Sequence, residues 1–108
     1  MATQGLVTVR NGEGVVIMKV IAGIDGMCAN ALANVLKSRW PLTAPEAHAA
    51  ALGVGFGSEE TLVVSTQTED YYVGDDDLST LYRETFDNPT FNPRWKYGIA
   101  DHTVIISV

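Results

Sequence analysis

Two apolar runs separated by an Asn-Gly pair constrain this chain more than any other feature. Residues 5–10 and 15–22 are rich in valine and isoleucine, and Asn11-Gly12 lies between them. Asn-Gly between such runs is the strongest short-range signal for a β-hairpin, because a type I′ turn needs positive φ at both central residues. A two-residue loop predicts four cross-strand pairs: Arg10 with Glu13, Thr8 with Val15, Val7 with Val16, and Leu6 with Ile17.

Side chains alternate along a strand, so this hairpin has two different faces. The first face is entirely apolar and consists of Val7, Val9, Val16, Met18, Val20 and Ala22. The second face is mixed and consists of Leu6, Thr8, Arg10, Val15, Ile17, Lys19 and Ile21. We expect the first face to form the core. The second face is too apolar to be left simply in water.

A helix is predicted over residues 27–39, directly after the hairpin. Asp25 is its expected N-cap. Apolar residues recur at helical spacing on one stripe, namely Cys28, Ala31, Leu32, Val35 and Leu36. Lys37 and Arg39 fall in the last turn, where cations interact favourably with the helix dipole. The pair Trp40-Pro41 ends the helix, because a residue before proline avoids helical ψ. We expect the stripe to pack on the first face of the hairpin.

A second, alanine-rich helix is predicted from Thr43 to about Leu52. Thr43, Pro45 and Glu46 have the spacing of a capping box with proline in the first turn. Three glycines at alternate positions over residues 53–57 then predict a helix C-cap followed by a loop. A mobile lid or a phosphate cradle are the alternatives. The cradle lacks the Gly-Lys-Ser/Thr ending and the strand-to-helix context that it needs.

The second half of the chain predicts more strands and one more helix. Residues 61–66 and 71–73 have β-strand character, and residues 78–86 have helical spacing with Asp76 or Asp77 as cap. Residues 95–100 and 103–108 are expected to form a closing hairpin around Asp101-His102. The whole pattern predicts a single α+β domain over residues 1–108. We expect a mainly antiparallel sheet of four to six strands, with two or three helices packed on one face.

Composition and charge narrow the classes of function. The chain has 108 residues, of which 46% are hydrophobic and 19% charged, as in ordinary globular domains. The net charge is −6, and ten of the thirteen acidic residues follow residue 57, which argues against nucleic acid as a partner. No run approaches the roughly 18 apolar residues of a membrane span. No basic leader opens the chain, so we expect no membrane association and a cytoplasmic protein.

Few residues have the spacing of a metal or redox site. Cys28 is the single cysteine and, on an apolar stripe, is expected to be a buried thiol. Asp75-Asp76-Asp77, with Glu69 and Asp70 upstream, suggests either a hard-cation site or a solvated turn; the Asp-x-Asp-x-Asp-Gly pattern is absent. His48 and His102 have no second ligand at helical spacing, which favours a packing or surface role. We therefore expect no metal and no cofactor.

Thr3, Lys19 and Asp25 are the only residues that suggest catalysis. A threonine beside the first strand, a strand lysine and a following aspartate are the residue types of an N-terminal-nucleophile hydrolase, in which a free α-amine activates the hydroxyl. Met1 and Ala2 precede Thr3, however, and ordinary methionine removal exposes Ala2. Catalysis by this trio is the less favoured alternative.

The opening and the end of the chain carry a resemblance to a known group. Met-Ala-Thr-Gln-Gly, the hairpin and Asp25-Gly26 resemble small uncharacterised phage and bacterial proteins that open Met-Gly/Ala-Thr-Arg-Gly and close with an aromatic-led strand pair, here residues 95–108. The hairpin also resembles the first layer of an N-terminal-nucleophile-type sandwich. Gln4 stands where the group has arginine, and Met27 where an aromatic residue is usual. The resemblance implies architecture and no chemistry.

Two classes of function follow from these patterns. The favoured class is a non-enzymatic protein that works through self-association or partner binding, and the alternative is the small hydrolase. With the first hairpin face in the core, Leu6, Val15, Ile17 and Ile21 are left on the other side, where exposed apolar surface marks an interaction site. We expect these four residues to form a homodimer interface on this face or at the edge of the sheet, where the uncharged, apolar strand over residues 103–108 adds a second exposed surface. In the competing arrangement, residues 78–86 cover this face within one chain.

Overall fold

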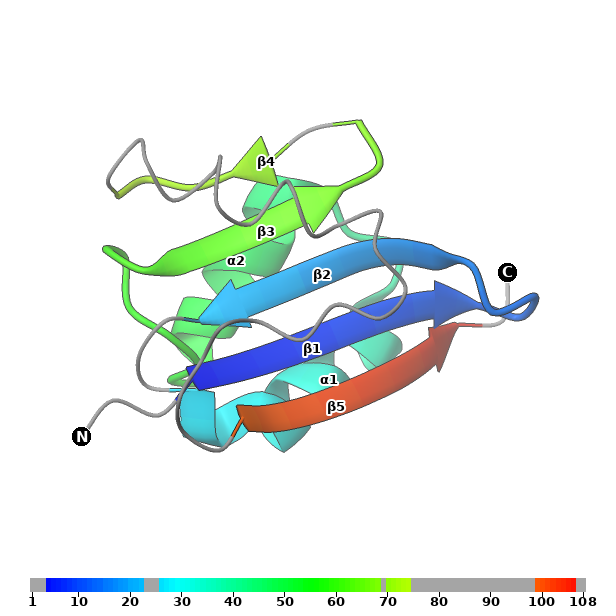
Figure 1. The fold of residues 1–108 in the computed structure, drawn as a ribbon, viewed down its shortest axis with the longest axis horizontal. Helices are drawn as coiled ribbons and strands as arrows, with labels where there is room; N and C mark the ends of the chain where they lie inside the picture. Colours follow the sequence, from blue (N-terminus) through cyan, green and yellow to red (C-terminus); the bar gives the residue numbers. More distant parts are fainter. Residues whose placement is uncertain (1–3, 23–25, 69, 75–98, 107–108) are drawn as a thin grey trace.

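A computed structural model of the chain describes residues 4–22, 26–68, 70–74 and 99–106. The strands are β1 (Gln4–Asn11), β2 (Val16–Ala22), β3 (Leu62–Thr66), β4 (Asp70–Tyr71) and β5 (Ile99–Ile106). The helices are α1 (Ala29–Arg39) and α2 (Ala44–Gly53), and a 3₁₀ turn, η1 (Gly26–Cys28), precedes α1. The strands form one five-stranded sheet in the order β4-β3-β2-β1-β5. Figure 1 shows both α-helices on the same face of it, which confirms the predicted α+β class.

The β1–β2 hairpin forms as predicted, but in a different register. Val7 pairs with Val20 and Val9 with Met18, whereas the sequence analysis paired Val7 with Val16. The predicted register is therefore wrong by four residues. Because side chains alternate with a period of two, an even shift leaves the paired residues from Gly5 to Val9 and from Met18 to Ala22 on their predicted faces. The apolar face consequently faces the helices, as expected.

The turn of this hairpin is a three-residue loop and not a type I′ turn. The Asn11 N–H donates to the Val15 carbonyl at 2.9 Å, and the Gly14 N–H donates to the Asn11 carbonyl at 3.0 Å. Gly14 has φ of 84°, which is the left-handed residue that such loops require. The Asn11 Oδ1 accepts from the N–H groups of Glu13 and Val15, at 2.9 and 3.0 Å, and so stabilises the longer loop.

A β-bulge follows this loop on strand β2. Arg10 pairs with Val16 while Val9 pairs with Met18, so Ile17 is the extra residue on β2. A bulge bends the strand and redirects the side chain at that point. Ile17 is half-buried and packs against the core cluster, so its predicted place on the second face is wrong.

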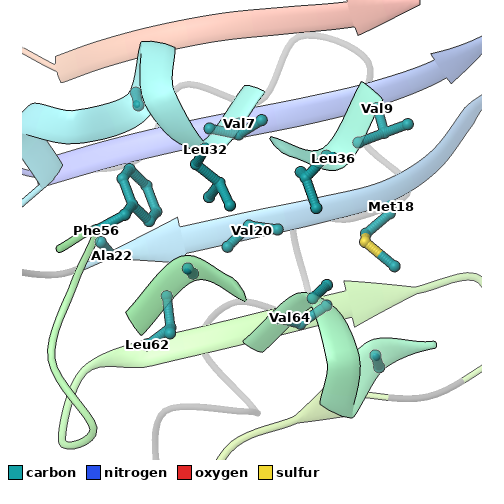
Figure 2. Close-up of a cluster of buried hydrophobic side chains, with 14 residues drawn as sticks. Val7, Val9, Met18, Val20, Ala22, Leu32, Leu36, Phe56, Leu62 and Val64 are labelled. Atoms are coloured by element: carbon teal, nitrogen blue, oxygen red, sulfur yellow. The ribbon is translucent and has the colours of Figure 1, made fainter. Parts of the chain in front are cut away.

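The core lies between the helices and the sheet, as Figure 2 shows. Leu32 and Leu36 of α1 meet Val7 and Val20 of the sheet, and all four side chains are fully buried. The complete cluster also contains Val9, Met18, Ala22, Ala29, Ala44, Ala47, Ala51, Phe56, Leu62 and Val64. Alanines on α2 allow this helix to approach the sheet closely, because they fill little space between the two layers.

Helix α1 begins later than predicted, and it is capped differently. Its N-cap position is Cys28, which makes no side-chain capping bond, so Asp25 is not the N-cap of α1. Asp25 itself lies outside the described residues. Ala29 belongs to the buried face, whereas the predicted stripe residue Ala31 is exposed. Cys28 is half-buried rather than buried, because it stands at the helix end and not on the covered stripe.

Helix α2 confirms the predicted capping box. The Thr43 Oγ1 accepts from the Glu46 N–H at 3.3 Å, and the Glu46 Oε1 accepts from the Thr43 N–H at 2.9 Å. The helix ends at Gly53, and the Val54 N–H donates to the Ala50 carbonyl. Phe56, in the glycine-rich loop, is fully buried in the core. The loop is thus anchored by an aromatic side chain.

Strand β5 corrects the prediction for the end of the chain. It runs without interruption through Asp101 and His102 and pairs with β1 in parallel, Val7 opposite His102. The expected turn at Asp101-His102 is therefore wrong, because a long-range parallel partner replaces the local antiparallel one. Strand β4 begins at Asp70, one residue earlier than predicted. The predicted helix over 78–86, the acidic run Asp75–Asp77 and residues 95–98 lie outside the described residues.

Candidate functional site

A row of polar residues crosses the sheet on the face opposite the helices. Thr8 pairs with Lys19, Lys19 with Ser65, and Ser65 with Asp70, so the row spans strands β1 to β4. Thr8, Lys19 and Ser65 are only 6%, 5% and 0% exposed. The Ser65 Oγ donates to the Asp70 Oδ1 at 2.6 Å. Paired residues on neighbouring strands have Cβ atoms about 4.5–5.5 Å apart, so each side chain lies beside the next.

Burial restricts the states that the polar groups of this row can adopt. A buried lysine is tolerated only where its ammonium group is paired or hydrogen-bonded, because an isolated charge in a protein interior is very costly. Lys19 is not without a partner. The fully buried Ser65 donates its hydroxyl proton to Asp70. In this arrangement the row specifies how strands β2, β3 and β4 line up.

Of the predicted catalytic trio, only Lys19 lies among the described residues. Lys19 lies on β2 in the polar row, whereas Thr3 and Asp25 lie outside the part of the chain that the structure describes. The neighbours of Lys19 in the sheet are Thr8 and Ser65, and sequence analysis selected neither. A usable signal existed for Lys19, which is the one polar residue in the middle of the otherwise apolar strand β2.

His48 is a buried titratable group on the helix side of the sheet. It lies on α2, is 4% exposed, and packs edge-to-face on the Tyr71 ring of β4, with ring centroids 5.2 Å apart and an interplanar angle of 83°. Its Nε2 is buried without a hydrogen-bond partner among the described residues. Burial lowers the pKa of His48, while a hydrogen bond to the Leu62 backbone and the charge of Glu59 act in the opposite direction. The packing role predicted for His48 is confirmed.

The expected dimer interface is only partly exposed. Leu6 and Ile21 are buried within the single chain, so the expectation that they are left in water is wrong. Val15, next to the hairpin loop, is 45% exposed. Of the four interface residues, Val15 is therefore the one whose side chain is accessible to a second molecule, since Ile17 packs on the core.

The two edges of the sheet differ strongly from each other. Strand β4 forms one edge, is two residues long and begins with the charged Asp70. Strand β5 forms the other edge, is eight residues long, and carries Ile105 with 60% of its surface exposed. Among the described residues, no strand pairs with the outer edge of β5. Natural sheets usually protect such an edge with charges, proline, a bulge or short length.

A shallow groove lies between the end of α1 and the outer side of α2. Its wall is mostly aliphatic and is formed by Val35, Arg39, Pro41, Leu42, Glu46, Ala49, Ala50, Gly53 and Val54. Arg39 and Glu46 are both exposed, and the Glu46 carboxylate is held by the capping box. The two opposite charges give the groove no clear preference for one ligand charge.

Neither the described residues nor the comparisons with known proteins identify a metal site or a relative of this chain. Within residues 4–22, 26–68, 70–74 and 99–106, no three or more His, Cys, Asp or Glu side chains are grouped to hold a metal ion. None of the described helices combines the length and the apolar character needed to cross a membrane. No protein-family model matches the chain, and neither a curated protein nor a solved structure is similar enough to count as a match.

Proposed function

We propose that this protein acts through self-association and not through catalysis, and that two copies pair along the outer edge of strand β5. The observation that supports this proposal is the contrast between the two sheet edges. The β4 edge is short and charged, which discourages pairing, whereas the β5 edge is long and exposes Ile105. After Asp101, no residue of β5 carries an acidic or Lys/Arg side chain that would repel a neighbouring strand.

Two-fold symmetry suits this edge. A symmetric pair uses the same patch on both subunits, and a strand that meets its own copy across a two-fold axis normal to the sheet runs antiparallel to it. Main-chain hydrogen bonds then supply affinity and the alternating side chains supply specificity, as in other strand-addition complexes. In such a dimer the helices of both copies lie on the same side of one continuous sheet.

Light scattering coupled to size-exclusion chromatography tests the proposal. We expect about twice the 11.6 kDa chain mass at micromolar concentration. Ile105→Lys places a charge on the exposed edge and should reduce the mass to that of one chain with an unchanged circular dichroism spectrum. Val73→Lys is the matched control, because Val73 is 55% exposed but follows β4 at the opposite edge. A monomeric native chain, or an Ile105→Lys variant that is still dimeric, contradicts the proposal.

The finer expectations about partners follow from the same proposal. We propose a cytoplasmic protein that needs no cofactor. We also propose that it does not bind nucleic acid, because its net charge is −6 and a phosphate backbone requires clustered cations. Val15→Lys tests whether the hairpin end extends the interface. It should weaken the dimer only if Val15 contributes to the interface. The mass of the Ile105→Lys variant decides the proposal in either case.

The hydrolase with Thr3, Lys19 and Asp25 is the alternative proposal. Only Lys19 of this trio supports it, as a buried amine on a central strand. Intact-mass spectrometry distinguishes the two. A mature chain that starts at Thr3 favours the hydrolase, whereas a chain that starts at Met1 or Ala2 leaves the threonine without the free α-amine on which that chemistry depends.

A further inference from the structure

We infer that His48 is a pH-sensitive latch that holds helix α2 on strands β3 and β4, and that protonation of its imidazole releases this helix from the sheet. The inference concerns a region remote from β5 and does not depend on dimer formation. It starts from the position of the ring: His48 is 4% exposed and lies between α2 and the Tyr71 ring, 5.2 Å from it.

Burial and the unpartnered Nε2 of this imidazole favour the neutral form, although the Leu62 backbone acts on its pKa in the opposite direction. One ring nitrogen bonds to the Leu62 backbone, whereas the buried Nε2 has no partner among the described residues. A neutral ring leaves only an unused lone pair at Nε2. A protonated ring instead has a buried N–H and a positive charge there without an acceptor, and such groups destabilise the state that buries them.

The charged groups around α2 do not compensate an imidazolium fully. Glu59 is exposed and its attraction acts against the effect of burial without cancelling it, since the pKa of His48 is lowered overall. On β4, the Tyr71 ring is the contacting group, and Asp70 is bonded to Ser65 on the opposite face of the sheet. Four charged groups remain on the other elements. The Glu46 carboxylate is bonded to Thr43, and Lys37 and Arg39 are exposed at the end of α1. Lys19 lies on the opposite face of the sheet. Strand β3 has no Asp, Glu, Lys, Arg or His.

The direction of the pH effect follows from this lowered pKa. The unfolded chain binds the proton near the ordinary value of 6.5 and the folded chain only at lower pH. His48 therefore contributes its full stabilisation above pH 6.5, and this is lost as the pH falls below 6.5 through the pKa of the folded state. One proton changes the opening equilibrium constant by at most about tenfold per pH unit.

Native-state hydrogen exchange on the intact protein tests the latch. Between pH 7.5 and 5, after correction for intrinsic exchange rates, we expect the opening constant of the α2 amides to rise by up to about tenfold per pH unit below 6.5. The α1 amides should show a smaller rise. His48→Phe keeps a buried ring against Tyr71 and should remove the pH dependence. His102→Gln changes the other histidine of the chain and should retain it.

An NMR titration of the wild-type imidazoles gives a second measurement that does not depend on the His48→Phe variant. The His48 resonances, assigned with His102→Gln, should titrate below 6.5. A His48 imidazole that titrates at 6.5 or above overturns the inference. Equal pH dependence of α2 exchange in the wild type and in His48→Phe overturns it as well.

Discussion

Replacing Ser65 by alanine removes the hydroxyl that donates to Asp70 in the buried polar row. The bond is short, 2.6 Å, and its acceptor is a carboxylate oxygen, which places it among charge-assisted hydrogen bonds. Such bonds contribute about 1.5–3 kcal/mol. Asp70 is half-buried and has a further interaction, so it is not left entirely without partners. We therefore expect Ser65→Ala to lower the free energy of unfolding by about 1–2 kcal/mol.

Urea denaturation followed by circular dichroism measures this loss. For a domain of this size, a loss of 1–2 kcal/mol corresponds to a decrease in Tm of roughly 4–8 °C. Ser38→Ala is a matched control, because Ser38 is exposed on α1 and donates only to the carbonyl of Val35 at 3.2 Å. Its effect should stay within about 0.5 kcal/mol.

A double-mutant cycle with Asp70→Ala separates the pair from its surroundings. If the two side chains interact as described, the cycle should give a coupling energy of about 1 kcal/mol. The reasoning is refuted if the coupling energy is zero within error, or if Ser65→Ala is as mild as Ser38→Ala. Either result means that the polar row does not stabilise the alignment of β3 and β4.

Three further predictions concern the N-cap of α2 and two loop glycines. Thr43→Ala removes half of the capping box and should lower the free energy of unfolding by about 1 kcal/mol. Because the bonds to Thr43 lower the pKa of Glu46, the stabilisation that they provide is present above pH 4.5 and is lost as the pH falls through the lowered pKa, which a pH series of urea titrations measures. Gly57→Ala should be clearly destabilising, since Gly57 has φ of 77° and an added Cβ lies 3.0 Å from the Leu62 Cδ1. Gly12→Ala, whose added Cβ has no atom within 4 Å, should be close to neutral. Thermal melts of the two variants measure the difference.

The hairpin shows which parts of the fold local sequence determines. The two faces of β1 and β2 were predicted correctly away from the bulge at Ile17, because alternation depends only on the parity of each position. The loop was not, because Asn11, Gly12 and Gly14 suit a two-residue and a three-residue connection about equally in sequence terms. The Asn11 side chain, which accepts hydrogen bonds from two backbone N–H groups, is compatible with the three-residue loop. The capping box of α2 was predicted correctly because all of its bonds lie within four residues.

Long-range pairing explains what the sequence could not reveal. Strand β5 was predicted as part of a local hairpin, and its partner is β1, some ninety residues earlier in the chain. The polar row has the same character, since Lys19 and Ser65 become neighbours only through the β2–β3 register. Lys19 is visible alone as a polar residue in an apolar strand. Its association with Ser65, and the pairing with Asp70, depends on a strand order that periodicity does not encode.

The strand order also has a consequence for the time course of folding in the cell. Strands β1 to β4 pair with their neighbours in chain order, whereas β5 joins the sheet at β1, on the side opposite β4. During synthesis, about ninety residues are added after β1 before its parallel partner β5 is made. At 5–20 residues per second, this synthesis takes about 5–20 s. Closing such a long loop is slow compared with forming a hairpin. For this interval the nascent sheet presents the unpaired outer edge of β1, and a chaperone that covers this edge should increase the yield of native protein.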